Sequence, residues 1–170
     1  MSIVTTRRSV RKFDLNKKIP DSILEELCKA GEQAPTARKQ ESREYIIIND
    51  HELIKEIAKG YKCTMIIEEC NTMIAVVGKN PDNLPCQPFQ VIDLACASEN
   101  IMVEAVDKKI GSVIIGTYPN QDRVDRANEL LGLNDGRFVF AFICLGYPLD
   151  KDCFFESNKV EKIKISYNRG

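Results

Sequence analysis

The chain has 170 residues and a formal net charge of -1, from 24 basic and 25 acidic residues. This length suits a single domain over residues 1–170, and the balanced charge excludes a strong general attraction to nucleic acid or to a membrane surface. No apolar run approaches the roughly 20 residues that span a bilayer, and the N-terminus lacks the apolar segment of a signal peptide. We therefore expect a cytoplasmic protein with neither nucleic acid nor membrane as a partner.

Hydrophobic spacing predicts the elements of the first half of the chain. A short helical lead-in over 2–8 would turn Ile3 and Val4 inward. Asp21 is placed to cap the next helix, because its carboxylate can accept the amide hydrogens of the first turn. The further elements are a helix ending near Gly31, a loop at 34–37, a strand at 45–48, a helix at 51–59 and a strand at 73–78.

The second half continues this alternation after a loop at 79–85. The helix over 91–107 is apolar on much of its circumference, which is typical of a central helix. A strand at 111–116, a helix at 121–131 ended by Gly132 and a strand at 138–145 follow. The pattern predicts an α+β fold with four to five strands in a central mixed or antiparallel sheet flanked by helices. Basic tails without an intramolecular partner suggest an intertwined homodimer.

The seven cysteines indicate reduced thiols rather than a disulfide framework, because their number is odd and no pair is spaced C-x-x-C. Cys63 and Cys70 are seven residues apart and could share one side of a helix, so a redox pair stays open. A single histidine, His51, argues against a closed zinc site, and we expect no metal. Three cysteines lie in apolar patterns and are predicted to be core residues: Cys28, Cys96 and Cys144.

No side-chain constellation for nucleophilic catalysis can be assembled, so an enzyme with this sequence would take its chemistry from a cofactor. The stretch Arg7-Arg8-Ser9-Val10-Arg11-Lys12-Phe13 places three guanidinium groups within five residues. Such groups repel one another unless an anion lies between them, and the planar fork of arginine suits phosphate. The alternative is a solvated basic arm.

Taken with this stretch, four further motifs show a resemblance to a known family. They are Ala34-Pro35-Thr36-Ala37, the helix with Ala97 and Asn100, Gly111-Ser112-Val113-Ile114-Ile115-Gly116, and Leu145-Gly146-Tyr147-Pro148. In order and spacing the chain resembles the nitroreductase family of FMN-dependent oxidoreductases over roughly residues 3 to 167, as a short single-domain member.

The resemblance implies a homodimer with FMN at the subunit interface. Arg7, Arg8, Ser9 and Arg11 would hold the phosphate, the ribityl chain or the pyrimidine side of the flavin. Pro35, Thr36 and Ala37 of the other subunit would cover the ring, Ile114 and Ile115 would pack on it, and the Gly116 N–H would lie near flavin N5. Lys162, or else Lys159 or Lys164, would add a phosphate contact. The alternatives without a ligand are that Arg8 is an exposed arginine, that Gly116 only ends a strand, and that the C-terminal lysines are solvated.

One stretch departs from the family. After Ala-Pro-Thr-Ala the family usually carries Asn and then Gln-Pro-Trp, whereas this chain has Lys39, Gln40, Glu41, Ser42 and Arg43. Lys39 at the pyrimidine edge would stabilise an anionic reduced flavin. The altered stretch could also mean a divergent pocket with a changed substrate preference. The insertion that often covers the active site in larger members is missing, so we expect an open site.

The resemblance implies hydride transfer from NADH or NADPH through flavin N5 to a nitroaromatic, a quinone or a similar acceptor, in a ping-pong order. No side chain need act as acid or base, since the flavin carries the chemistry. Two alternatives stay open. One is an FMN-binding store or sensor without turnover, and the other is a thiol-dependent redox protein that uses Cys63 and Cys70.

Overall fold

A four-stranded antiparallel sheet lies at the centre of the molecule, with the strand order β1-β2-β4-β3. The structure is a computed structural model and describes residues 2–62, 64–156 and 163–168. The strands are β1 (Arg43–Ile48), β2 (Thr72–Gly78), β3 (Gly111–Gly116) and β4 (Phe138–Gly146). The prediction of an α+β fold around a central sheet is confirmed.

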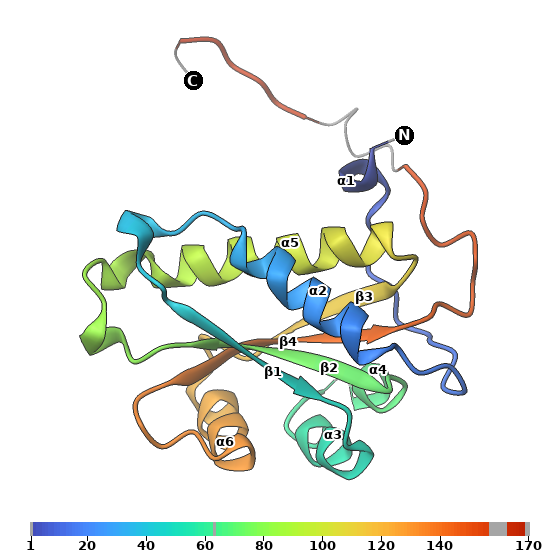
Figure 1. Cartoon of the computed structure of the whole chain (residues 1–170), viewed down its shortest axis with the longest axis horizontal. Coiled ribbons are helices and arrows are strands. Elements are labelled where there is room, and N and C mark those ends of the chain that lie inside the picture. Colours follow the sequence, from blue (N-terminus) through green and yellow to red (C-terminus); the bar gives the residue numbers. More distant parts are fainter. Residues whose placement is uncertain (1, 63, 157–162, 169–170) are drawn as a thin grey trace.

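Helices cover both faces of this sheet (Figure 1). One face carries α2 (Asp21–Glu32) and α5 (Gln90–Asp107), while the other carries α3 (His51–Ala58), α4 (Thr64–Glu68) and α6 (Gln121–Leu131). The short α1 (Ile3–Thr6) contacts α5, and single 3-10 turns occur at 37–39, 81–83 and 87–89. Within the described residues, no helix combines the length and apolarity that crossing a membrane requires.

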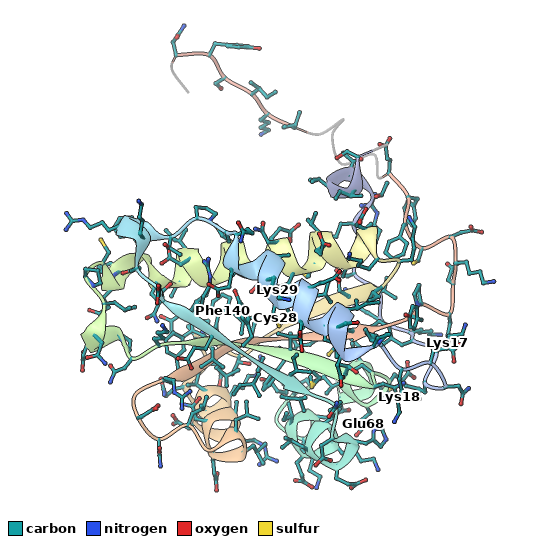
Figure 2. All side chains as sticks on the ribbon, viewed as in Figure 1. Lys17, Lys18, Cys28, Lys29, Glu68 and Phe140 are labelled. Atoms are coloured by element: carbon teal, nitrogen blue, oxygen red, sulfur yellow. The ribbon has the colours of Figure 1, made fainter. Side chains whose placement is uncertain are left out.

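The two-residue repeat of the strands divides the core between these faces. Met73, Ala75 and Val77 of β2 join the cluster under α3, α4 and α6, whereas Ile74 and Val76 join the cluster under α2 and α5. All five are fully buried. Figure 2 shows the side chains that fill the space between the sheet and its helices, with Phe140 among them. The apolar runs of the sequence are therefore explained by burial on both sides of the sheet.

The N-terminal arm, residues 7–13, runs along the edge of the sheet formed by β3. Ser9 forms a parallel bridge with Ser112, and Phe13 forms an antiparallel bridge with Pro148. A β-carbon at Gly111 would lie 2.7 Å from a methyl group of Val10. A β-carbon at Gly146 would lie 2.7 Å from the β-carbon of Phe13. Glycine at 111 and 146 thus permits the close approach of the arm.

Two local predictions are wrong. Pro20 precedes α2 as its cap residue and Asp21 is the first helical residue, with no side-chain capping bond at this end. A proline-initiated helix already lacks one of the amide donors that a cap would satisfy. Ile3 and Val4 are 39% and 63% exposed rather than turned inward, because Thr6 is the residue of α1 that faces the body.

Two element boundaries also differ from the prediction. β1 begins at Arg43, two residues before the apolar run, because pairing with Gly78 of β2 extends the ladder. The helix α4 forms over Thr64–Glu68, a stretch for which only the spacing of Cys63 and Cys70 suggested a helix. By contrast, Gly132 ends α6 in the left-handed conformation with a φ of 68°, as predicted for a glycine at this position.

The described cysteines differ in how deeply the fold buries them. Cys70 and Cys144 are fully buried, and the Cys70 thiol donates to the carbonyl oxygen of Ile67 at 3.1 Å. Cys28 and Cys96 are only half-buried, so the prediction of core burial is wrong in degree for these two. Burial raises the pKa of the Cys28 thiol to about 11. Cys63, the other member of the suggested redox pair, lies outside the described residues.

The arm's close approach predicts a stability difference between two glycine-to-alanine variants of β3. Gly111→Ala should lower the free energy of unfolding by about 1–3 kcal/mol, because the new β-carbon displaces Val10. Gly116→Ala is the matched control, since its β-carbon would meet only the carbonyl oxygen of Tyr118, at 3.9 Å. Urea unfolding of the two variants measures the difference, and equal midpoints would contradict the packing of the arm on Gly111.

Candidate functional site

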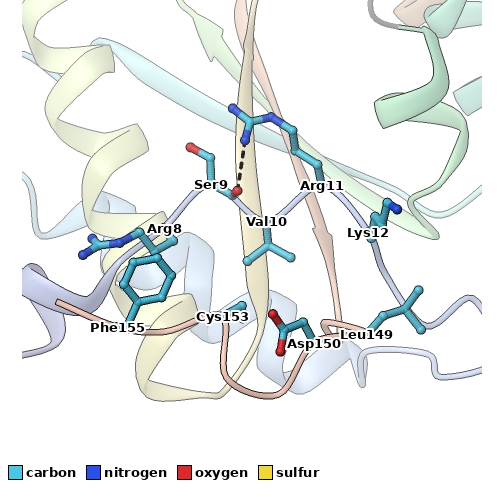
Figure 3. Close-up of a pocket in the computed structure, with 9 residues that line it drawn as sticks. All are labelled: Arg8, Ser9, Val10, Arg11, Lys12, Leu149, Asp150, Cys153 and Phe155. Atoms are coloured by element: carbon cyan, nitrogen blue, oxygen red, sulfur yellow. Dashed lines mark hydrogen bonds between the residues drawn. The ribbon is translucent and has the colours of Figure 1, made fainter. Parts of the chain in front are cut away.

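The arm and the segment after β4 enclose a pocket of about 550 Å³ (Figure 3). The residues of the arm that line it are Arg8, Ser9, Val10, Arg11 and Lys12; those of the later segment are Leu149, Asp150, Cys153 and Phe155. Among the described residues that line it, three are basic and one is acidic, so the pocket is electropositive. Burial, and next the charge of Asp150, raise the pKa of the Cys153 thiol, which therefore adds no second negative charge at neutral pH.

Arg8 is the least satisfied charged side chain of this pocket. Its Nη1 donates to the Arg7 carbonyl oxygen at 2.6 Å, and its guanidinium carbon lies 4.8 Å from the centre of the Phe155 ring. Its Nε and Nη2 are buried and have no hydrogen-bond partner among the described residues. A buried guanidinium without acceptors costs free energy, and an anion with several oxygen atoms would satisfy both donors at once.

The other two arginines of the arm have different surroundings. The Arg7 Nε lies 3.1 Å from Glu99 Oε1 on α5, and Arg7 is not among the residues that line the pocket. The exposed Arg11 donates from Nη1 to the Ser9 carbonyl oxygen at 3.2 Å. Figure 3 shows the side chains of Ser9 and Arg11 on one side of the arm and Val10 on the other. Two of the three guanidinium groups therefore line one pocket, rather than all three.

The backbone of β3 shows which of its groups face outward. The Thr117 N–H donates to the Phe140 carbonyl oxygen at 3.1 Å, toward β4. The Ser112 carbonyl oxygen instead accepts from the Val10 N–H at 2.9 Å, away from β4. Alternate residues of an antiparallel edge strand direct their N–H and C=O groups outward. Ile114 and Gly116, which alternate with Ser112, therefore present their amides at the open edge beyond the arm.

Gly116 combines this outward amide with free space. The position of a β-carbon there has only the Tyr118 carbonyl oxygen within 4 Å, at 3.9 Å. The Gly116 carbonyl oxygen accepts from Arg123 Nη1 at 3.3 Å, which ties this end of the strand to α6. A flat ring can approach such a backbone without meeting a side chain.

The two isoleucines before Gly116 face opposite sides of the sheet. Ile114 is 38% exposed, whereas Ile115 is 7% exposed and belongs to the cluster under α6. The side chain of Ile115 packs in the core, so of the two predicted ring contacts the one from Ile114 has the exposed side chain, while that from Ile115 stays a prediction. The period of two in a strand separates them, and Ile114 is the one available to a ligand.

A buried carboxylate organises the loop that contains Ala37. Asp93, in the first turn of α5, is 3% exposed. It accepts from the Ala37 N–H at 3.0 Å, from Gln40 Nε2 at 2.8 Å and from Ser42 Oγ at 2.8 Å. Gln40 also bonds both backbone groups of Cys86. Sequence reasoning missed Asp93, whose only signal was an acidic residue within the apolar first turns of the helix.

The divergent stretch is mostly structural. Arg43 is 6% exposed, and its Nη2 donates to the carbonyl oxygens of Glu32 and Ala34 at 2.8 Å each, at the end of α2. Arg43 therefore fixes the start of the Pro35 loop from beneath, and does not line a substrate pocket. Arg38 and Lys39 are exposed and have left-handed φ values of 49° and 56°, so the loop turns sharply at its tip.

The remaining predicted site residues belong to this loop or to the tail. Pro35 is exposed, while Thr36 and Ala37 are half-buried. Lys159 and Lys162 lie outside the described residues, and Lys164 is exposed. The structure thus gathers Arg8, Ser9 and Arg11 in one pocket beside β3.

Comparison with known proteins agrees with this architecture. The profile of the nitroreductase family matches residues 4–71. A protein of Archaeoglobus fulgidus, provisionally named an NADH dehydrogenase/NAD(P)H nitroreductase, is 32% identical over 93% of this chain and 90% of its own. The chain belongs to the nitroreductase family.

Solved structures of similar proteins share the whole fold. A provisionally named NADH dehydrogenase/NAD(P)H nitroreductase of Parabacteroides distasonis superposes with a TM-score of 0.88 at 26% identity, over 99% of this chain and 96% of that one. A provisionally named NADH oxidase of Clostridium acetobutylicum superposes with a TM-score of 0.88 at 28% identity, over 98% of this chain and 99% of that one. An FMN-dependent nitroreductase of Clostridium difficile, at 18% identity, shares the fold with a TM-score of 0.87, over 99% of both chains.

The hydrogen bonds of Asp93 predict that its loss loosens the Ala37 loop. Asp93→Ala should cost about 3 kcal/mol of unfolding free energy, because the buried Gln40 amide and Ser42 hydroxyl lose their acceptor. Hydrogen exchange at the Ala37 amide should quicken as well. Asp107→Ala, at the exposed end of the same helix, is the matched control and should change stability by less than about 0.5 kcal/mol. Similar losses in both variants would contradict this role.

Proposed function

We propose that this chain is a single-domain, FMN-dependent oxidoreductase that transfers hydride from NAD(P)H to a nitroaromatic, a quinone or a similar acceptor. The observation that carries the proposal is the half-buried Arg8 side chain beside an open strand edge, whose buried Nε and Nη2 have no acceptor among the described residues. Family membership supports it, as do the name of the Archaeoglobus fulgidus relative and that of the FMN-dependent nitroreductase with the same fold.

The residues at the edge fit the parts of FMN. Arg8, Ser9 and Arg11 would hold the phosphate and ribityl chain in the electropositive pocket. Arg7 would assist from beside Glu99, and Lys162 is a candidate for a further phosphate contact. Farther along β3, Ile114 would lie against the ring. The outward N–H of Gly116 would donate to its N5 edge.

Bound FMN would supply the chemistry, which is the uptake and release of a hydride equivalent. The chain's own residues would bind the phosphate, orient the ring at the strand edge and leave one face accessible. We assign no side chain as catalytic acid or base. NAD(P)H and the acceptor would use the same accessible face in turn, which is the basis for proposing a ping-pong order.

The covering loop argues for a homodimer. Pro35, Thr36, Ala37 and Lys39 precede β1, whereas the arm lies on β3, and these strands are the opposite edges of the sheet. Three strand spacings, about 14 Å, separate the two edges. We propose that the loop of one subunit covers the flavin that the arm of the other subunit binds.

Exposed apolar side chains support the same assembly. Ile163, Ile165 and Tyr167 are 66%, 65% and 85% exposed, and Figure 1 shows this segment extending beyond α1, away from the sheet. A second subunit would give these side chains a surface to cover. Lys39, at the tip of the loop, would then reach the partner's flavin and stabilise its anionic reduced form.

Removal of the Arg8 guanidinium should weaken FMN binding. Arg8→Ala should raise the dissociation constant about ten- to hundredfold, because charge-assisted hydrogen bonds to the phosphate are lost. Quenching of flavin fluorescence during titration measures this, without interference from tryptophan because the chain has none. At saturating FMN, the oxidation of NADPH by a quinone should recover in the variant.

Lys17→Ala is the control for this experiment, since exposed Lys17 pairs with Asp14 outside the pocket. It should bind FMN as the wild type does. Equal affinities of the Arg8→Ala variant and the wild type would contradict the phosphate site. Tight FMN binding by a wild-type protein that oxidises NADPH no faster than free FMN does would instead favour the store or sensor.

A further inference from the structure

A second pocket, of about 510 Å³, begins two residues beyond Gly116. Its walls come from three parts of the chain: the segment that leads into α5, the start of α6 with Tyr118, and the start of β4. The family motifs of the sequence do not include these residues. The two pockets share none of their described lining residues, so this pocket is separate from the Arg8 pocket.

Aromatic rings form one wall of this pocket. The rings of Tyr118 and Phe138 lie 5.6 Å apart between centres at an angle of 49°, and Phe140 lies 6.4 Å behind Tyr118. Tyr118 is 41% exposed although it is held by two rings. A preordered aromatic side chain with a free surface is suited to bind another flat ring.

The pocket is uncharged. None of the described residues that line it carries a charge, and its polar groups include the side-chain amides of Gln87 and Gln121. The Arg8 pocket, by contrast, is lined by two arginines and a lysine. A carboxylate entering the uncharged pocket would lose hydration without gaining a counter-charge, whereas a neutral ring would lose little.

The pocket also adjoins the proposed site of hydride transfer. The space over Gly116 is open, since the nearest described atom to its missing β-carbon is the backbone carbonyl oxygen of Tyr118 at 3.9 Å, and Tyr118 also lines the pocket. Gly116 and Tyr118 are separated by Thr117 alone, and Thr117 is held by a hydrogen bond to Tyr61. A ring bound against Tyr118 can therefore extend to the face of Gly116.

We propose that this pocket binds the aromatic ring of a neutral, planar electron acceptor and selects against anionic ones. The inference rests on the proposed function, in which FMN lies beside Gly116. For a nitro compound the reaction is NAD(P)H + H⁺ + ArNO₂ → NAD(P)⁺ + ArNO + H₂O. The acceptor takes up two electrons and two protons, and one oxygen atom leaves as water.

The test compares two acceptors that differ in charge, neutral 4-nitrobenzamide and anionic 4-nitrobenzoate, with the FMN-loaded enzyme. The wild type should show a KM about tenfold lower for the amide. Tyr118→Ala should raise the KM for the amide about five- to tenfold at unchanged kcat, because ring stacking is lost. Tyr118→Phe keeps the ring and should behave as the wild type does.

Two further measurements separate selectivity from structural damage. Gln87→Lys places a positive charge on the exposed rim and should lower the KM for 4-nitrobenzoate. Reduction of ferricyanide, which can take electrons without a ring pocket, should be equal in the wild type and the two Tyr118 variants; Gln87→Lys is left out of this comparison because its positive charge also attracts the ferricyanide anion. An unchanged KM in Tyr118→Ala together with no shift in Gln87→Lys would overturn the proposal.

A protein that is not an oxidoreductase would give a different result in these assays. If no acceptor, ferricyanide included, is reduced by NADPH, then the oxidoreductase assignment fails and the pocket is tested by binding alone. Saturation-transfer NMR with 4-nitrobenzamide should then detect binding to the wild type and a loss of signal with Tyr118→Ala. Equal signals from both proteins, or none from the wild type, would overturn the pocket assignment.

Discussion

The site depends on the backbone pairing of the arm with β3, through the hydrogen bond from the Val10 N–H to the Ser112 carbonyl oxygen, with the bridge between Phe13 and Pro148 holding the far end of the arm. This hydrogen bond pairs the arm with β3 at one register, so that Arg8 precedes the paired position and Arg11 follows it. Backbone N–H and C=O groups point outward at every second residue of an edge strand. The bond to Ser112 therefore shows that the backbone groups of Ile114 and Gly116 point outward as well. A shift of the arm by one residue would move each arginine to the other side.

The opposite edge of the sheet has its own anchor. Asp93 holds the Ala37 loop by three hydrogen bonds, and Arg43 holds the end of α2 that leads into it. Both residues are charged and almost fully buried, which is costly unless their partners are fixed. This cost explains why the loop keeps a defined shape although its tip is exposed. Arm and loop thus have defined shapes at two opposite edges of the sheet, and in the proposed homodimer a second subunit would bring them together.

Much of the fold could be predicted from sequence because its signals are local. The apolar runs gave β2 and β4, the helical spacing gave α3 and α6, and Gly132 ended α6 as expected. The side chains of the strand Gly111–Gly116 could also have been assigned to the two faces of the sheet from sequence, since the period of two puts Ile114 and Ile115 on opposite faces. The arm's sequence indicated an anion site, but not which of its arginines would share a pocket.

The rest depends on contacts between distant parts of the chain. Asp93 lies 51 residues from Ser42, so its role arises only when α5 meets the loop. Arg43 stands where the family usually carries an aromatic residue, and only the position of α2 shows that its side chain bonds the end of that helix. The rings of Tyr118 and Phe138 come from different elements of the chain, and no local pattern joins them.

The most direct test of this account is the titration of isotopically labelled protein with FMN, followed by amide NMR. The account predicts that the largest shifts occur at the Ile114 and Gly116 amides and at the Arg8 Nε–H. Leu15 and Thr72, which line a pocket elsewhere on the molecule, should be unaffected. Shifts concentrated around Leu15 and Thr72, with Gly116 unchanged, would contradict a flavin site on the edge of β3.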